Sequence, residues 1–190
     1  LKEVGSLIPP AKSSAQVSMN TGISGSLSGN KELCDVPLYS DILTLPYGLK
    51  GYFDFEQGMA CARALNKPVF LDFKGHACSN CKKMEAEVWS DPAVLERLSR
   101  NFVIIALYVD DRYQMPREKW ITSPVDGKVK KTIGARNADL QIEKFRSNTQ
   151  PLYAITDPEG NLLAGPLGAE FNISKFIAFL DRGMERFHQK

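Results

Sequence analysis

The sequence predicts an α/β fold in which a mixed central sheet carries helices on both faces. Two observations predict it. Segments with helical spacing alternate with short apolar runs of strand length from about residue 52 onward, and two strand-like runs joined by a turn precede a final amphipathic helix. Strands that alternate with helices pair in parallel, whereas a closing hairpin adds antiparallel strands, so both kinds of pairing are expected in one sheet.

The first three elements follow from periodicity and length. Residues 55–66 are expected to form a helix because apolar side chains recur there at helical spacing. The run PVFLDF, residues 68–73, has the length and bulk of a strand. The run FVIIALYVD, residues 102–110, is apolar almost throughout, which predicts a strand buried on both faces.

Between these two strands the sequence predicts two helical pieces. The first begins near Cys78 and turns Met84 and Val88 inward, and it is expected to stop or bend near Trp89. Asp91-Pro92 then has the pattern of an N-cap followed by proline in the first helical position. AVLERLSR continues from there as the second piece.

The second half of the chain begins with a less regular insertion, residues 111–148. Asp126-Gly127 predicts a hairpin turn within it, and ADLQIEKFRS, residues 138–147, predicts a helix. PLYAITDPEGNLLAG then has the pattern of a strand, a turn and a strand. ISKFIAFLDRGMERF closes the chain as an amphipathic helix, whose apolar stripe is Phe176, Ile177, Leu180, Met184 and Phe187.

Composition divides the chain and excludes two classes of function. Residues 1–48 are expected to form a linker or extended arm, because Ser, Gly and Pro are frequent there without a sustained period, and residues 49–190 form the folded domain. The formal net charge of +2 and the absence of a basic stripe argue against nucleic acid as a partner. No apolar run reaches the ~18 residues of a membrane helix.

Cys78 and Cys81 stand three positions apart at the expected start of a helix. This spacing brings the two sulfurs to one face within bonding reach. The free N–H groups of the first turn stabilise a thiolate on Cys78 and lower its thiol pKa from ~8.5. Cys81, one turn further in, is expected to be more buried and to resolve a mixed disulfide formed by Cys78.

A zinc site is the main alternative. Zinc takes four ligands, and one CxxC supplies two. Cys34, Cys61 and His76 could complete the set, but there is no second CxxC and no His-x-His pair. No metal is therefore expected. For Cys61 a buried free thiol is the default interpretation, and pairing with Cys34 or with another chain stays open.

The segments KPVFLDFKGHACSNCKKME, EVWSDPAVL and TQPLYAITDPEGN resemble a thioredoxin-fold domain. The resemblance is closest to the C-terminal domain of DsbD-type thiol:disulfide interchange proteins of the Bacteroidetes type, and it covers roughly residues 50–187. It implies a thioredoxin-like fold with an N-terminal arm and an insertion before a cis-proline strand. Residues 1–48 would be the connector that follows a membrane domain.

The resemblance assigns roles to further residues. Asp72 corresponds to the partly buried acid beneath the cysteines, with a raised pKa and a part in proton transfer to or from Cys81. Glu85 corresponds to a second acid that opposes thiolate formation. Pro151, after Gln150, corresponds to the cis-proline beside which a partner's extended chain pairs. The alternatives are a structural hydrogen bond for Asp72, a solvated helix position for Glu85 and an ordinary trans proline at 151.

The sequence also departs from the family pattern. His76 and Ala77 stand where many members have tryptophan, next to the expected partner surface. A protonated His76 close to the sulfur would favour the thiolate. Ser79-Asn80 replaces the Gly-Pro of thioredoxin between the cysteines.

Together these features predict a thiol:disulfide oxidoreductase that needs no bound cofactor, because the dithiol is the redox centre. The resemblance implies a periplasmic reductase, tethered through its parent protein, that takes electrons from a membrane domain and passes them to protein thiols, including those of cytochrome c biogenesis. A stand-alone reductase or isomerase is one alternative. A binding module whose CxxC is structural or zinc-bound is another.

Overall fold

A computed structural model describes residues 33–190, and residues 1–32, most of the expected arm, lie outside the described part. A four-stranded sheet has the strand order β2-β1-β5-β6. β1 (Val69–Lys74) runs parallel to β2 (Val103–Tyr108) and antiparallel to β5 (Leu152–Thr156), and β5 pairs antiparallel with β6 (Leu162–Leu167). The mixed sheet predicted from the sequence is confirmed.

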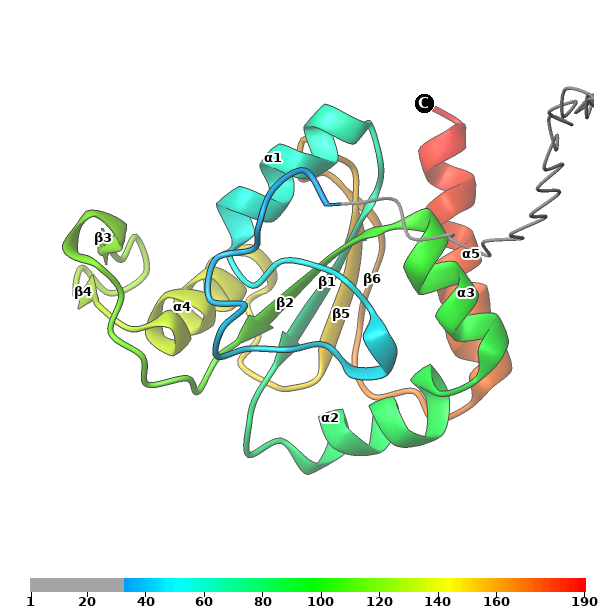
Figure 1. Cartoon of the computed structure of the whole chain (residues 1–190), viewed down its shortest axis with the longest axis horizontal. Coiled ribbons are helices and arrows are strands. Elements are labelled where there is room, and N and C mark those ends of the chain that lie inside the picture. Colours follow the sequence, from blue (N-terminus) through cyan, green and yellow to red (C-terminus); the bar gives the residue numbers. More distant parts are fainter. Residues whose placement is uncertain (1–32) are drawn as a thin grey trace, which may run out of the picture.

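Helices cover both faces of this sheet (Figure 1). α1 (Phe55–Leu65) and α4 (Ile133–Phe145) lie on one face, and α3 (Pro92–Asn101) and α5 (Ile173–His188) lie on the other. α2 (Ser79–Met84) lies across the end of the sheet at which β1 ends. The segment with both motif cysteines is therefore at one end of the sheet.

The helices begin where side chains cap them. Asp91 accepts hydrogen bonds from the N–H groups of Ala93 and Val94, so α3 starts at Pro92 as predicted. α4 begins earlier than the sequence predicted, at Ile133, because the Thr132 hydroxyl accepts the N–H of Ala135 and supplies an N-cap.

α2 continues without a break into a π-helical turn, η2 (Glu85–Trp89). A π turn accommodates one more residue than an α turn, and here both Val88 and Trp89 are fully buried. The helix ends at Ser90 and the chain bends at Asp91 before α3, so the bend predicted near Trp89 is confirmed.

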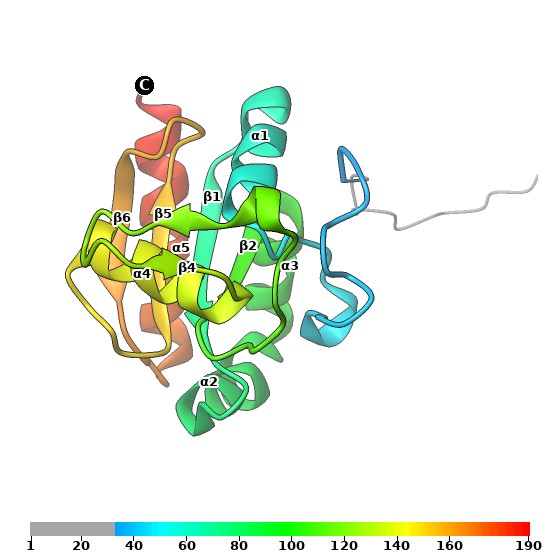
Figure 2. The ribbon, with the colours of Figure 1, turned by 90° about the vertical axis from the view of Figure 1, so that its left-hand side faces the viewer.

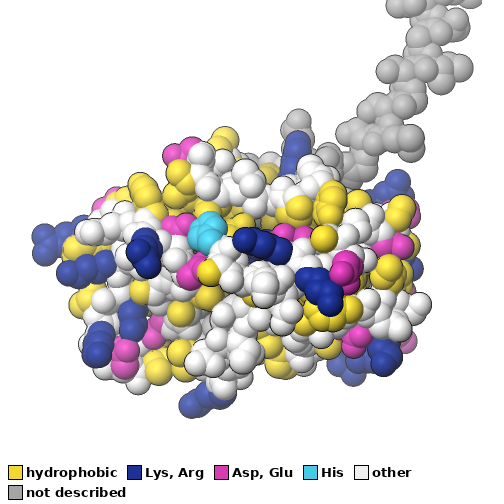
Figure 3. All heavy atoms as spheres, turned by 90° about the horizontal axis from the view of Figure 1, so that it is seen from below, with side chains coloured by type: hydrophobic (Ala, Val, Ile, Leu, Met, Phe, Trp, Pro, Cys, Tyr) yellow, Lys and Arg dark blue, Asp and Glu magenta, His cyan; other side chains and the backbone are white. Residues whose placement is uncertain are grey.

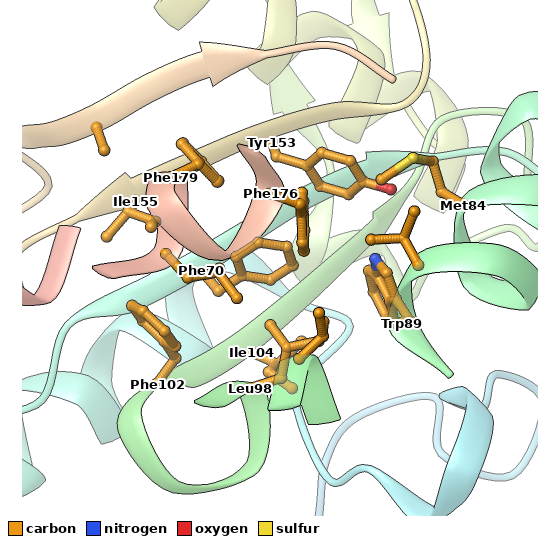
Figure 4. Close-up of a cluster of buried hydrophobic side chains, with 14 of the residues drawn as sticks. Phe70, Met84, Trp89, Leu98, Phe102, Ile104, Tyr153, Ile155, Phe176 and Phe179 are labelled. Carbon is orange, nitrogen blue, oxygen red and sulfur yellow. The ribbon is translucent and has the colours of Figure 1, made fainter. Parts of the chain in front are cut away.

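The core on the α3 and α5 side is built around Phe70 of β1 (Figure 4). Its ring centroid lies 5.4 Å from that of Tyr153, 5.8 Å from Trp89 and 6.3 Å from Phe176. Offset and edge-on aromatic contacts of this kind add to the free energy of apolar burial. This core fixes the π turn and α5 against the middle strand.

Alternation along β1 sets the direction of the polar residues that follow Phe70. Leu71 and Phe73 belong to the core under α1 and α4, whereas Phe70 faces the α3 and α5 side. Successive side chains of a strand point to opposite faces, so Asp72 and Lys74 share the face of Phe70. All six residues of β1 are buried.

The described residues before α1 pack on the domain. Cys34 forms a disulfide with Cys61 of α1, and Leu43 is buried in a small cluster beside the sheet. A short 3-10 turn, η1 (Pro46–Gly48), follows. The default interpretation of Cys61 as a free thiol is wrong. Its burial was expected, but its pairing depends on a segment 27 residues away.

The insertion contains the predicted hairpin. β3 (Ile121–Thr122) pairs antiparallel with β4 (Val129–Lys130), and Gly127 adopts a φ of 74° in the turn between them. A 3-10 turn, η3 (Arg117–Lys119), precedes β3. Figure 2 shows β4 and α4 together in front of the sheet.

Candidate functional site

Cys78 and Cys81 are joined by a disulfide at the start of α2, with their Cα atoms 5.3 Å apart. Cys78 is the N-cap residue, and its Sγ accepts the backbone N–H of Cys81 at 3.1 Å. Cys78 is half-buried, whereas Cys81 is only 3% exposed. A molecule that approaches from outside therefore meets the sulfur of Cys78 first.

Cys78 lies in a groove formed by the ends of β1 and β2, the start of α2 and the turn before β5. The groove is lined by Gly75, Ala77, Cys78, Ser79, Asn80, Val109, Asp110 and Gln150. Figure 3 views the molecule from the side of α2, and acidic and basic side chains are interspersed across this face. A partner would meet no extended field of one charge here.

The loop between β1 and Cys78 is held by Asp110. Its carboxylate accepts the backbone N–H of His76 at 2.8 Å and that of Ala77 at 3.0 Å. Partial burial alone would raise the pKa of Asp110, but these two N–H groups outweigh it and lower that pKa. A Cβ on Gly75 would come within 3.0 Å of Asp110 Oδ2, so glycine permits the close approach.

Asp110 was missed in the sequence, although a signal was present. It follows a buried strand that runs parallel to β1, and the carboxyl ends of parallel strands meet at the same edge of a sheet. An acid two residues after the end of β2 is therefore expected to lie beside the residues that follow β1.

The His76 side chain contacts one side chain of β2 and one of the loop that follows β2. Its Nε2 lies 2.7 Å from an oxygen of Asp111, and its ring stacks on Tyr108 with centroids 4.3 Å apart. The side chain is exposed. The imidazole is thus partnered by a carboxylate, while Ala77 contributes its backbone N–H and a small methyl group to the groove.

Three charged side chains meet between β1 and the end of α2. Lys74 Nζ lies 3.6 Å from Asp72 Oδ2 and also hydrogen-bonds Glu85 Oε1. Asp72 is 2% exposed and Lys74 is 4% exposed, whereas Glu85 is half-buried. Cys81 stands four residues before Glu85, on the same side of the helix, and the Glu85 N–H bonds to the Cys81 carbonyl.

Burial dominates the titration of Asp72. Desolvation is the largest effect and raises the pKa of Asp72, Lys74 lowers it and Glu85 raises it, and together they bring this pKa to about 6. Burial alone would lower the pKa of Lys74, but the two carboxylates outweigh it, so that pKa is raised. A cation between two acids is stable in its charged form.

Lys74 is the second residue that sequence reasoning missed. A lysine at the end of a strand is ordinarily a solvated side chain, whose head reaches water. The signal was the spacing between Lys74 and Asp72. Positions two apart on a strand share a face, so the Lys74 side chain lies on the same face as that of Asp72, which the resemblance placed beneath the cysteines.

Gln150 and Pro151 lie opposite the start of α2. The Gln150–Pro151 peptide bond is cis. Gln150 lines the groove with Cys78, and its side-chain amide donates to Gln141 Oε1 at 2.9 Å, while Pro151 is buried behind it. The structure therefore brings Cys78 and Gln150 together around one groove, and Cys81 is buried behind Cys78, to which it is bonded.

The residues that might have completed a zinc site do not gather with the CxxC. Cys34 is bonded to Cys61, and α1, which carries Cys61, ends near the end of the sheet that lies away from α2 (Figure 1). Within residues 33–190, no three His, Cys, Asp or Glu side chains cluster as metal ligands would.

This arrangement can carry out one kind of chemistry directly. An accessible sulfur at a helix start, a second sulfur buried behind it and a buried carboxylate with a pKa near neutrality suit thiol–disulfide exchange coupled to proton transfer.

Comparison with known proteins gives the same fold. The family described as "Thioredoxin-like domain" matches residues 55–183. A structure titled "DsbH Oxidoreductase" aligns at a TM-score of 0.53 and 15% identity, over 75% of this chain and 91% of that one. No curated protein matches the chain by sequence.

Two further structures align less well. A thioredoxin from Thermus thermophilus has a TM-score of 0.49 at 20% identity, over 70% of this chain and 85% of that one. The reduced C-terminal domain of DsbD from Neisseria meningitidis has a TM-score of 0.45 at 18% identity, over 67% of this chain and 92% of that one. At such identities similarity indicates the fold alone. Within residues 33–190, no helix combines the length and apolarity needed to span a bilayer.

Proposed function

Because the chain belongs to the thioredoxin-like domain family, we propose that it is a thiol:disulfide oxidoreductase whose redox centre is the Cys78–Cys81 pair. The observation that carries the proposal is the asymmetry of the two sulfurs. Cys78 caps the helix and lines an open groove, while Cys81 is buried within bonding distance of it.

In the reductive direction, the Cys78 thiolate attacks one sulfur of a partner disulfide. The partner's other sulfur leaves as a thiolate and takes a proton from solvent. The Cys81 thiol gives its proton to Asp72, and its thiolate attacks Cys78 Sγ and expels the partner's second sulfur as a thiolate. That thiolate takes a proton from solvent, and Asp72 returns its proton to solvent before the next cycle. Two electrons thus pass to the partner, and an external dithiol must reduce the Cys78–Cys81 disulfide for the next cycle.

Two acids serve this cycle. Asp72 is the proton acceptor, a role supported by its burial and by its pKa of about 6, which lets it exchange protons near neutral pH. Glu85 is half-buried one turn beyond Cys81 and opposes thiolate formation by charge repulsion.

The partner's chain lies in the groove beside Gln150 and Pro151. This role is supported by the position of Gln150 across the groove from Cys78. Ala77 leaves room for the partner because its side chain is small. His76 lies at the edge, where its pairing with Asp111 shapes the surface rather than the sulfur.

The chain is further proposed to be the C-terminal domain of a DsbD-type protein of the Bacteroidetes type, working as a periplasmic reductase that receives electrons from a membrane domain of the same parent. The segments KPVFLDFKGHACSNCKKME and EVWSDPAVL support this. The Cys34–Cys61 disulfide supports an oxidising compartment, because such bonds persist there. Under this proposal residues 1–48 connect the two domains.

Insulin reduction with dithiothreitol tests the proposal. The unaltered chain should accelerate precipitation of the insulin B chain, Cys78→Ser should abolish the acceleration, and Cys81→Ser should accumulate a mixed disulfide through Cys78. The double variant Cys34→Ser, Cys61→Ser is the matched control and should still accelerate precipitation. Equal rates for the unaltered chain and Cys78→Ser would refute the assignment. Zinc content by elemental analysis tests the metal-bound alternative separately.

A further inference from the structure

Another cavity lies on the face of the sheet that α1 and α4 cover. This α1–α4 cavity has a volume of about 350 Å³, and none of its lining residues also lines the groove of Cys78. A cavity of about 150 Å³ holds a benzene molecule, so this one has room for a ring with a short chain attached. Sites that bind small molecules combine such apolar space with a few polar groups that orient the ligand.

The walls of the α1–α4 cavity are apolar and come from several elements. Leu71 of β1 is 1% exposed and is the most buried of them, while Phe55 of α1 and Phe145 of α4 are half-buried. Leu162 of β6 is 48% exposed. The hydroxyl of Thr156 in the wall already donates to a backbone carbonyl. An apolar molecule that displaces water from these walls therefore gains free energy.

The charged residues that line this cavity are both cations. Lys144 is in the last turn of α4, and Arg146 follows that helix. The Lys144 ammonium lies 5.0 Å from the centroid of the Phe55 ring. Both cationic side chains are exposed, and within residues 33–190 neither forms an ion pair with a carboxylate. The apolar walls are thus accompanied by positive charge that no described acid neutralises.

The backbone at Arg146 is an independent indication. Arg146 is the C-cap of α4 and has a φ of 53°, in the left-handed region. Glycine is the commonest residue in this conformation at the end of a helix, because a Cβ there approaches the backbone at a cost in free energy. The C-cap of α1 has the same conformation and is Asn66, a residue that tolerates it better. An arginine in a strained position indicates that its side chain has a use.

We propose that the α1–α4 cavity binds a small apolar monocarboxylate, whose apolar body fills the cavity and whose carboxylate pairs with Lys144 and Arg146. A guanidinium suits this anion because its N–H groups match the two carboxylate oxygens. The site is separate from the redox pair, and the inference does not depend on the proposed function.

Charge favours a free acid over the chain's own first residues as the occupant. Residues 1–32 contain three lysines and two glutamates, a formal net charge of +1, so they do not complement two cations. A monocarboxylate supplies the missing negative charge and the apolar body in one molecule.

Nuclear magnetic resonance of the oxidised full chain, labelled with ¹⁵N, tests the proposal. The probe is 4-phenylbutyrate at low ionic strength, where screening is weak. The backbone amide signals of Arg146, Gly160 and Leu162 should shift and saturate with a Kd of ~0.1–1 mM, as expected for a ligand of this size. The amides of Gly75 and Ala77 in the groove should not shift. The neutral analogue 4-phenylbutan-1-ol should bind at least about threefold more weakly, because it has no charge to pair.

Variants of the lining residues test each part of the site. Lys144→Gln and Arg146→Gln should each weaken 4-phenylbutyrate binding by about 2- to 5-fold, and Arg112→Gln, an exposed arginine that lines neither site, is their control. Leu162→Glu should abolish binding, because its carboxylate repels the ligand and pairs with the same cations. Leu65→Glu is the matched control, since Leu65 is 39% exposed and does not line the cavity.

Arg146→Gly separates binding from stability. It should weaken binding as Arg146→Gln does, yet raise Tm by about 2–4 °C, because glycine adopts the left-handed conformation without strain. A residue kept only for the fold would not combine these two effects.

Three results would overturn the inference. They are the absence of saturable shifts at the cavity, equal affinity for the acid and the alcohol, and unchanged affinity in both Lys144→Gln and Arg146→Gln. A synthetic peptide of residues 1–32 that shifts the cavity amides, while 4-phenylbutyrate does not, would assign the cavity to that segment and also overturn it. The same spectra show whether a variant is folded, and if none is, the comparison of acid and alcohol on the unaltered chain decides.

Discussion

Replacement of Asp72 by asparagine should stabilise the protein, and the gain should depend on pH. Asp72 is 2% exposed, and burial raises its pKa from the ordinary 3.8 to about 6. A folded state that holds a proton more tightly than the unfolded chain loses stability as pH rises through this window. Below pH 3.8 the acid is protonated in both states and the penalty is absent. Above pH 6 it is ionised in both, and the penalty is complete.

The magnitude follows from the size of the shift. Each pKa unit corresponds to about 1.4 kcal/mol, so a shift of roughly two units costs ~3 kcal/mol at pH 7. Asparagine has nearly the same shape and cannot ionise, so Asp72→Asn avoids the cost. The difference in unfolding free energy between variant and parent should therefore grow by about 2–3 kcal/mol between pH 4 and pH 7.5, and then stay level.

Urea unfolding of the oxidised proteins at pH 4, 5, 6 and 7.5 measures this difference, with fluorescence of the buried Trp89 as the signal. Asp181→Asn is the matched control, because Asp181 forms an ion pair with Arg97 on the surface. Its effect should stay within ~1 kcal/mol at every pH. A difference for Asp72→Asn that is the same at all four pH values would refute the reasoning, since no proton would then be linked to folding at this residue.

Three further predictions concern the scaffold around the site. The double variant Cys34→Ala, Cys61→Ala removes a cross-link of sequence separation 27, and its unfolding free energy, measured in urea, should be lower by ~3–4 kcal/mol. An unchanged urea midpoint of unfolding would mean that the segment before α1 is held by its other contacts alone. Phe176→Ala should cost ~3–5 kcal/mol because Phe176 is fully buried, while the half-exposed Phe171→Ala should cost ~1 kcal/mol or less; similar losses would contradict the core described above. Asp110→Ala leaves the N–H groups of His76 and Ala77 without their carboxylate, so it should lower the unfolding free energy by ~1–2 kcal/mol and slow insulin reduction. The control Asp126→Ala, in the distant hairpin, should leave the rate of insulin reduction unchanged.

The fold was predictable because most of its elements have strong local signals. The strand around Phe70, the capped start at Asp91 and the closing helix each combine a clear period with a clear boundary. The start of α4 was less accessible, because Gly134 lies in its first turn and weakens the helical pattern. Only the Thr132 cap signals it, and a lone threonine is common outside caps.

Within the site, the two motif cysteines were predictable because three-residue spacing at a helix start fixes their geometry. Lys74 and Asp110 were not singled out, because a charged residue in a strand or after one is ordinarily solvated. Both side chains are instead paired with groups distant in the sequence. Lys74 bonds to Glu85 of η2, and Asp110 accepts a hydrogen bond from the loop before Cys78. The Cys34–Cys61 bond was open for the same reason, since two cysteines 27 residues apart can bond only where the fold brings them together.

The residues just before α1 contact the surroundings of the site. Composition placed the boundary between arm and domain at residue 48, and residues on the arm side of it bond to the domain. Tyr47 donates its hydroxyl to the Glu85 carbonyl at 2.8 Å, and the Tyr108 hydroxyl donates to the Thr44 carbonyl at 3.3 Å. Glu85 and Tyr108 are both neighbours of Lys74. A buried charge keeps its strong electrostatic effect only while water is excluded from it. Residues 44–47 therefore belong to the surroundings of the charges that meet between β1 and α2, although they contribute none of them.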